Sequence, residues 1–226
     1  DQDEDTMSGS KSKESNRPKV RYIEGKSMNS IWVTQSLGVD PATGYELFQA
    51  VNGDIVTTWS TDNYVIGGCT DSDLEGTFGT NLAWKGFQLN AIFRYNYGGQ
   101  VYNQTLVDKV QDADLRENVD RRVFEDRWQK PGDKVMFTRL IGGATANVTS
   151  VTKPTSRFVE DNNWLELSTL NVSYEFKMDW MKKVGLKRLK ALFYMNDVFR
   201  VSTVKQERGI DYPFARNFSI GLQARF

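Results

Sequence analysis

The feature that most constrains this chain is the regular alternation of apolar and polar residues over long segments. In residues 87–97, apolar or aromatic side chains occupy every second position, and only Ile92 interrupts the polar set between them. Side chains of a β-strand point alternately to its two faces, so the segment predicts a strand with one apolar face. The segment has about six apolar positions on one face. Its length is therefore close to the ~9 to 11 residues that a strand needs to cross a bilayer, and it is longer than the mean strand of soluble proteins.

The same alternation predicts further strands. In residues 78–84, Phe78, Leu82 and Trp84 share one parity. Residues 164–176 alternate in the same way, and residues 189–201 do so less regularly. The second of these segments changes parity near Ser168 and Thr169, which predicts a β-bulge. The clearest alternation is the final one, with Phe218, Ile220, Leu222, Ala224 and Phe226 on one side.

The connections between these segments alternate in length. Lys85 and Gly86 form one brief connection and residues 177–188 another, whereas residues 98–163 and 202–215 are long and polar. Short turns at one end and long loops at the other are typical of outer-membrane barrels. Within the first long loop, residues 104–128 have a helical period that ends before Pro131 and Gly132, which predicts a loop helix.

The chain divides into three predicted regions. Residues 1–18 are polar and charged, which predicts a mobile loop or tail. Residues 19–75 contain short apolar pieces and turn signals, among them Asn52 and Gly53, which predict an extracellular loop region with small hairpins. Residues 76–226 are expected to form the C-terminal barrel strands and their long extracellular loops.

Composition excludes several classes of function. Lysine plus arginine equals aspartate plus glutamate, at 29 each, so no net charge favours nucleic acid. The chain has no histidine and a single cysteine, Cys69, and therefore lacks the usual general base and metal ligands. We expect neither an enzyme nor a bound cofactor or metal. A transmembrane helix is also excluded, because no run of about 18 apolar residues occurs.

Clusters of carboxylates are the nearest approach to a chemical site. The acidic groups at residues 1–5 and 71–75 lack the pattern of a calcium-binding loop, and the acids at 112, 114, 125 and 126 are adjacent in a polar stretch. Solvated surface charge is the better interpretation of both. A soluble β-sandwich is an alternative to the barrel strands, because its strands also have one apolar face. Aromatic residues at the strand ends favour the membrane, where such residues form interfacial girdles.

Several segments resemble the C-terminal third of SusC/RagA-family TonB-dependent transporters. They occur in the family's order and cover most of the chain after Arg21. The segments are GVDPATGYELF (38–48), WKGFQLNAIFRYNYGGQVYN (84–103), DRWQKPGD (126–133), SRFVEDNNWLELSTLNVSYEF (156–176) and STVKQERGIDYPFARNFSIGLQARF (202–226).

The resemblance implies an all-β fold in which this chain is an antiparallel transmembrane segment, the last strands of a barrel of about 22 strands. It implies a Gram-negative outer membrane, a SusD-like surface lipoprotein as a lid, and TonB-driven uptake of oligosaccharides or peptides. The sequence contains no TonB box or plug and too few strands to close such a barrel. We therefore expect the N-terminal plug and barrel part of the same transporter as a partner. The alternative is a self-contained cell-surface β-protein, an adhesin or binding module, that binds carbohydrate.

Two expectations concern individual residues. The apolar sets of residues 87–95 and 218–226 are expected to contact lipid, with the intervening polar residues facing a wet lumen. Phe218 and Phe226 resemble the C-terminal signal read by the barrel assembly machinery, although Phe226 as a plain interfacial anchor is the alternative. Aromatic residues of the long loops are candidates for ligand or lid contacts, without assignment of any one of them: Tyr102, Trp128, Phe137, Tyr212 and Phe214.

Overall fold

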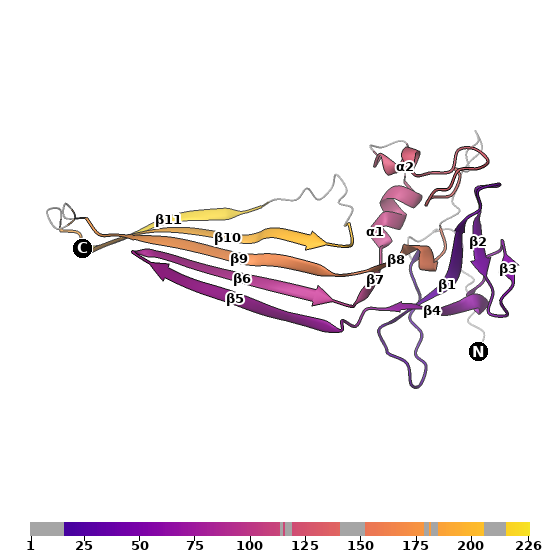
Figure 1. Ribbon diagram of the computed structural model, residues 1–226, viewed down its shortest axis with the longest axis horizontal. Coiled ribbons are helices and arrows are strands. Elements are labelled where there is room, and N and C mark those ends of the chain that lie inside the picture. The colour runs from indigo at the N-terminus through magenta and orange to yellow at the C-terminus, as the bar shows by residue number, and fades with distance from the viewer. Residues whose placement is uncertain are drawn as a thin grey trace, which may run out of the picture. The chain divides into compact units, whose positions relative to one another are not determined.

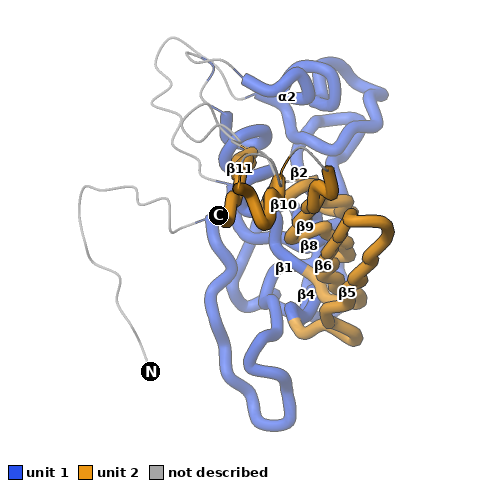
Figure 2. Tube along the Cα trace, turned by 90° about the vertical axis from the view of Figure 1, so that its left-hand side faces the viewer, with its two compact units in different colours: residues 1–70, 101–160 blue, residues 71–100, 161–226 orange. Residues whose placement is uncertain are grey.

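A computed structural model describes residues 16–113, 115, 119–140, 152–178, 181, 185–205 and 216–226. The chain divides into two compact units, shown in two colours in Figure 2. Unit 1 comprises residues 1–70 and 101–160, and unit 2 comprises residues 71–100 and 161–226. Most of the tail predicted at residues 1–18 lies outside the described residues.

Unit 2 is built on one antiparallel sheet of five long strands (Figure 1). Its order is β11-β10-β9-β6-β5, so sequence neighbours are also neighbours in space. The strands are β5 (Leu74–Trp84), β6 (Phe87–Tyr97), β9 (Trp164–Phe176), β10 (Arg188–Ser202) and β11 (Phe218–Arg225). Each predicted strand is present, and β6 has the predicted bounds. The predicted all-β, antiparallel fold with a short loop helix is confirmed.

The turn between β5 and β6 is as tight as the sequence predicts. Lys85 and Gly86 both have positive φ, at 45° and 95°, as the two central residues of a tight hairpin turn require. Gly86 also lies against β9, because a Cβ atom there would come 2.8 Å from the carbonyl oxygen of Glu175. The Glu175 amide donates to the Gly86 carbonyl at 2.9 Å, which ties the turn to the neighbouring strand.

The predicted bulge in β9 lies where the parity of the sequence changes. Ile92 of β6 pairs with Thr169, but the next residue, Phe93, pairs with Leu167, so Ser168 is the extra residue. The Ser168 hydroxyl donates to the Ile92 carbonyl at 3.2 Å. The bulge moves Leu165 and Leu167 onto the same face as Leu170 and keeps that face apolar along the whole strand.

Unit 1 contains a smaller sheet in the order β3-β2-β1-β4. Its strands are β1 (Ser30–Val39), β2 (Glu46–Gln49), β3 (Ile55–Val56) and β4 (Tyr64–Cys69). Phe48 pairs with Val56 across the β2–β3 hairpin, and Gly53 in its turn has a φ of 92°. The hairpin predicted at Asn52 and Gly53 is therefore confirmed.

The helical part of unit 1 is shorter than the sequence suggests. Helix α1 (Gln104–Leu106) continues as a π-helical turn (Val107–Gln111), and helix α2 (Arg122–Glu125) follows after a break. The helical character predicted for residues 104–128 is therefore present as short separate pieces. The Asn103 side chain caps the first helix by accepting from the Leu106 amide at 3.0 Å. The remaining short pieces of the chain are β7 (Gln100–Tyr102), β8 (Val159–Asp161) and 3-10 turns at Thr61–Asn63 and Ser156–Phe158.

The helices of unit 1 surround a compact apolar core. Val107, Val110, Val123 and Phe158 have no exposed surface, and Phe137 is 1% exposed. Their spacing along the helices is the source of the helical period in the sequence. None of the helices in the described part of the chain is long and apolar enough to cross a membrane.

Candidate functional site

The register of the five-stranded sheet aligns the apolar residues of all five strands on one face. Phe93 pairs with Phe78 on β5 and with Leu167 on β9, and Val172 of β9 pairs with Phe193 of β10. Residues paired directly across antiparallel strands lie on the same face. The apolar face continues onto β11 through the pairs Phe193–Ile220, Ala191–Leu222 and Met195–Phe218.

Much of this apolar face is exposed rather than packed into a core. Ile220 and Leu222 are 73% and 74% exposed, and Trp84 is 68% exposed. Buried members such as Ala91 and Leu167 are covered within the sheet by neighbours on adjacent strands. A contiguous apolar surface of this kind marks contact with lipid or with another protein, because water disfavours it.

Aromatic rings reinforce the apolar face from strand to strand. The Phe78 and Phe93 rings stack with their centroids 5.0 Å apart, and Phe87 lies 4.6 Å from Tyr174. Trp84 stands beside the β5–β6 turn, with the Lys85 ammonium 5.0 Å from its ring. An aromatic ring next to a cation at a strand end is typical of the boundary between lipid and water.

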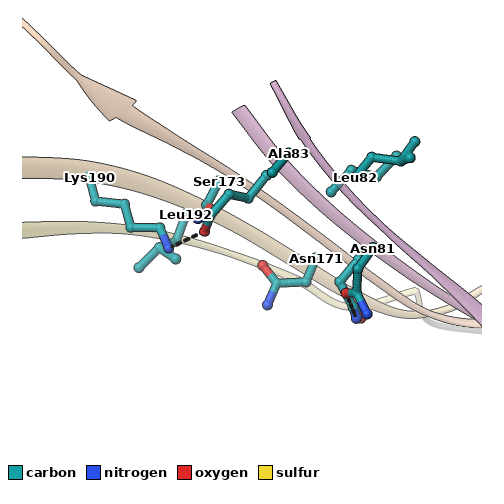
Figure 3. Close-up of a pocket in the computed structure, with 10 residues that line it drawn as sticks. Asn81, Leu82, Ala83, Asn171, Ser173, Lys190 and Leu192 are labelled. Atoms are coloured by element: carbon teal, nitrogen blue, oxygen red, sulfur yellow. Dashed lines mark hydrogen bonds between the residues drawn. The ribbon is translucent and has the colours of Figure 1, made fainter. Parts of the chain in front are cut away.

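The opposite face of the sheet is polar. Asn81, Asn90 and Asn171 face each other across three neighbouring strands, and Asn90 donates to the Asn81 side-chain oxygen at 2.5 Å. Lys190 donates to the Gln88 side-chain oxygen at 2.9 Å. These residues line a depression of about 320 Å³. Figure 3 shows Leu82 directed away from Asn81 and Asn171.

Farther along the polar face, charged groups are paired or stacked. Arg200 of β10 lies 3.7 Å from a Glu166 carboxylate oxygen and 4.4 Å from the Trp164 ring centroid. Arg188 donates to Glu175 at 2.6 Å near the other end of the strands. Amides, hydroxyls and paired charges of this type suit a surface that lines water and binds polar solutes.

The two residues predicted as an assembly signal lie at opposite ends of β11. Phe218 begins the strand on the apolar face, with its ring 6.1 Å from that of Phe193, and is well exposed. Phe226 follows the last strand residue, and its carbonyl accepts from the Lys187 ammonium at 3.3 Å. Among the described strands, β11 pairs only with β10, so it forms one edge of the sheet. Its role in assembly remains a prediction.

Loop aromatics that were candidates for ligand contact have structural neighbours in unit 1. Tyr102 packs edge-on against Phe158, and Phe137 belongs to the core. Trp128 donates to the Pro41 carbonyl at 2.9 Å and covers Gly44. These three residues hold the loops together, while Tyr212 and Phe214 lie outside the described residues.

Unit 1 also contains buried charges that strand and helix patterns do not identify. Arg157 binds both carboxylate oxygens of Glu46, at 3.1 and 2.8 Å, with side chains 6% and 8% exposed. Arg127 donates to four backbone carbonyls, those of Val110, Gln111, Val123 and Thr138. Burial lowers the pKa of the Arg127 guanidinium, and the carbonyl bonds compensate its lost hydration. The contacts join segments far apart in sequence, so periodicity gives no sign of them.

No cluster able to hold a metal ion occurs within the described ranges. Cys69 is a single half-buried thiol at the end of β4.

Comparison with known proteins relates the chain to receptors. It is 28% identical over 198 residues to TonB-dependent receptor P39 of Formosa agariphila, covering 80% of this chain and 18% of that protein. It is 26% identical over 224 residues to TonB-dependent receptor P3 of the same organism, covering 85% of this chain and 20% of that protein. The chain thus spans about a fifth of the length of these curated relatives. No protein-family profile matches it.

Solved structures show the same fold. The RagAB peptide transporter superposes with a TM-score of 0.64 at 16% identity, over 86% of this chain and 22% of that one. The RagAB peptide importer in its closed-closed state gives a TM-score of 0.64 at 17% identity, over 86% of this chain and 23% of that one. These relatives are receptors and transporters, not enzymes. The chain's resemblance to SusC/RagA-type TonB-dependent receptors is confirmed over most of its length.

Proposed function

We propose that this chain supplies barrel-wall strands and extracellular loops of a TonB-dependent transporter in the outer membrane of a Gram-negative bacterium. The observation that carries the proposal is the two-faced sheet, with apolar residues exposed along one side and amides and charges along the other. Lipid stabilises the first face, and a water-filled lumen stabilises the second.

The two edge strands of the sheet support the proposal that the sheet is part of a larger barrel. β5 and β11 each have one partner strand among the described residues, and an open sheet edge in lipid leaves backbone groups without hydrogen bonds. Further strands of the same transporter therefore complete the wall on both sides. Together with an N-terminal plug inside the lumen, they form the assembly in which this chain acts.

The transported solute is an oligosaccharide or a peptide in this proposal. The structural neighbours are named as peptide transporters, and the polar face has many hydrogen-bonding groups for such solutes. A SusD-like lipoprotein covers the extracellular loops, and TonB supplies the energy through the N-terminal part. A self-contained carbohydrate-binding protein is disfavoured, because its sheet would pack the apolar face into a core, whereas Ile220 and Leu222 are exposed here.

The experiment compares this chain expressed alone with the intact transporter in detergent. The intact transporter is expected to migrate as a heat-modifiable barrel on gels. The 226-residue chain alone is expected not to, because its open sheet edges cannot satisfy backbone groups in lipid or detergent. A stable monomeric barrel formed by these residues alone would refute the proposal.

The assembly role of the last strand has its own test. Deletion of Phe226 from the intact transporter is expected to lower the transporter's outer-membrane level strongly, because the assembly machinery engages the last strand before the barrel closes. Phe218→Ala is the companion variant at the other end of β11. Unchanged membrane abundance after the deletion would leave Phe226 as an interfacial anchor only.

A further inference from the structure

Unit 1 contains a cavity of about 170 Å³ that the barrel wall does not explain. β2 contributes Glu46 and Phe48, and the loop before the first 3-10 turn contributes Trp59. Other lining residues come from much later in the chain. They are Gln111, Thr138, Arg139, Thr152, Lys153, Thr155 and Arg157, with Tyr45 from the loop before β2.

The ionised groups lining the cavity carry an excess of positive charge. Glu46 is the carboxylate that lines the cavity, and the positive charge of Arg157, which donates to both of its oxygens, balances the negative charge of Glu46. Arg139 and Lys153 have no carboxylate within 4.0 Å among the described residues. The Asp112 carboxylate accepts from the amide of the lining residue Thr152 at 3.0 Å, a neutral donor that leaves the carboxylate charge in place. Among the residues that the structure describes, Arg139 and Lys153 therefore have no ion-pair partner.

Aromatic rings hold these two cations at the cavity. The Arg139 guanidinium lies 4.9 Å from the Tyr45 ring centroid, and the Lys153 ammonium lies 5.5 Å from that of Trp59. Trp59 is itself fixed, because its indole nitrogen donates to the Pro154 carbonyl at 3.2 Å. A cation–π contact positions a cation without neutralising it, so both charges stay available to an anion.

Neutral polar groups at the cavity add hydrogen-bonding capacity. Thr155 is 1% exposed, and its hydroxyl oxygen has no hydrogen-bond partner in the described part of the chain. A buried hydroxyl without a partner costs free energy that a ligand or water can restore. The Gln111 amide donates to the Thr138 hydroxyl at 2.6 Å on the same wall.

We propose that this cavity binds a carboxylate group of the transported solute, held by Arg139 and Lys153. The inference rests on the proposed transport function and adds a chemical preference for acidic solutes. The cavity volume suits one acidic side chain or one sugar ring. An acidic peptide and a uronic-acid oligosaccharide present the same carboxylate, and the test distinguishes these sources.

The test measures binding of four probes to the purified full-length transporter in detergent. Triglutamate and trigalacturonate carry carboxylates, and triglutamine and galactotriose are their neutral counterparts. We expect at least one acidic probe to bind more tightly than its neutral counterpart. The double variant Arg139→Gln, Lys153→Gln is expected to weaken that binding about tenfold or more, because charge-assisted hydrogen bonds are lost. Preference for triglutamate identifies a peptide source, and preference for trigalacturonate a sugar source.

The control variant is Lys130→Gln, which removes an exposed cation of unit 1 that does not line the cavity. It should bind the acidic probe like the unmodified transporter. Equal binding of acidic and neutral probes, no binding of either acidic probe, or unchanged affinity in the double variant would overturn the inference. Heat-modifiable migration of each variant keeps this result separate from the transport proposal, since an intact barrel without acid binding contradicts the cavity assignment alone.

Discussion

The two units place large apolar side chains in opposite environments. In unit 1, Phe137 and Phe158 lie in a core and are almost completely covered. In unit 2, Ile220 and Leu222 of β11 lie on an open apolar face and are mostly exposed. Water favours the first arrangement, and in the proposed barrel wall lipid would stabilise the second.

Charged residues follow the same division. Unit 1 buries the Arg157–Glu46 pair inside its fold, whereas the charges of the five-stranded sheet, such as Arg200 and Glu166, occupy the polar face. A buried charge costs several kcal/mol unless a partner compensates it. Substitutions that remove a buried charge in unit 1, or that add a charge to either face of the sheet in unit 2, therefore test this difference between the two units.

The largest effect is expected from breaking the buried ion pair of unit 1. Arg157→Met leaves the Glu46 carboxylate buried without its partner and should destabilise unit 1 by about 3 to 5 kcal/mol. Limited proteolysis of the intact transporter during urea titration measures this loss. Arg122→Met is the control, since its pair with Asp120 is more exposed and should cost under about 1 kcal/mol. An equal loss of stability in both variants would contradict the prediction, because it would show that the Arg157–Glu46 pair contributes no more than an exposed ion pair.

The next effect compares the two faces at adjacent positions of β9. Leu170→Arg places a charge on the apolar face in the middle of the strand and should cost about 2 to 4 kcal/mol in a membrane. Asn171→Arg places the same charge on the polar face and should cost far less. Urea unfolding of the transporter in lipid vesicles, followed by tryptophan fluorescence, gives both values. A larger loss for Asn171→Arg would reverse the assignment of the faces.

A smaller effect is expected at a glycine that joins two loops of unit 1. Gly44 has a φ of 74°, and a Cβ there would meet the Trp128 ring at 2.5 Å. Gly44→Ala should therefore cost about 1 to 3 kcal/mol, from backbone strain together with displacement of the ring. Gly53→Ala provides the control, because Gly53 has a φ of 92° and no atom within 4 Å of a Cβ. Equal proteolytic stability of the two variants would show that the contact between residue 44 and the Trp128 ring adds nothing to the cost of the substitution.

The smallest effect is a pH dependence in unit 1. Desolvation by surrounding residues raises the pKa of the Asp112 carboxyl above its ordinary value of 3.8, although the residue retains solvent exposure and its hydrogen bonds with Thr152 oppose the shift. The folded unit holds this proton more tightly than the unfolded chain, so the contribution to stability is full below pH 3.8 and disappears as pH rises through the raised pKa. Asp112→Asn should lack this part of the pH profile. The same dependence of proteolytic stability on pH in Asp112→Asn and in the unmodified transporter would contradict the prediction.

Short-range patterns in the sequence predict unit 2 in detail. Alternation gives the bounds of β6, and the parity change at Ser168 gives the bulge of β9. Side chains two positions apart in a strand lie on the same face, so a single sequence is enough to predict which residues share a face. The tight turn at Lys85 and Gly86 is equally local, because its positive φ values favour particular residues.

Unit 1 is predicted less well because its contacts are long-range. Arg157 and Glu46 are separated by 111 positions, and nothing in either local segment indicates that they meet. The helical period of residues 104–128 comes from packing around one core, although the backbone breaks between α1 and α2. The cavity with Arg139 and Lys153 depends on the same long-range packing, and a charge count over the sequence does not reveal it.

The most direct test of the central claim measures which solvent meets each face of the sheet. Single spin labels are placed at Leu170 and Asn171 of the intact transporter in lipid vesicles, after replacement of Cys69 and every other native cysteine by serine. The accessibility of each label to oxygen and to a water-soluble nickel complex is then compared. Oxygen concentrates in lipid, so the label at 170 should be exposed to oxygen and shielded from nickel, with the reverse at 171. Shielding of the label at 170 from both reagents would mean that the apolar face packs into a protein core, which would contradict the barrel-wall assignment.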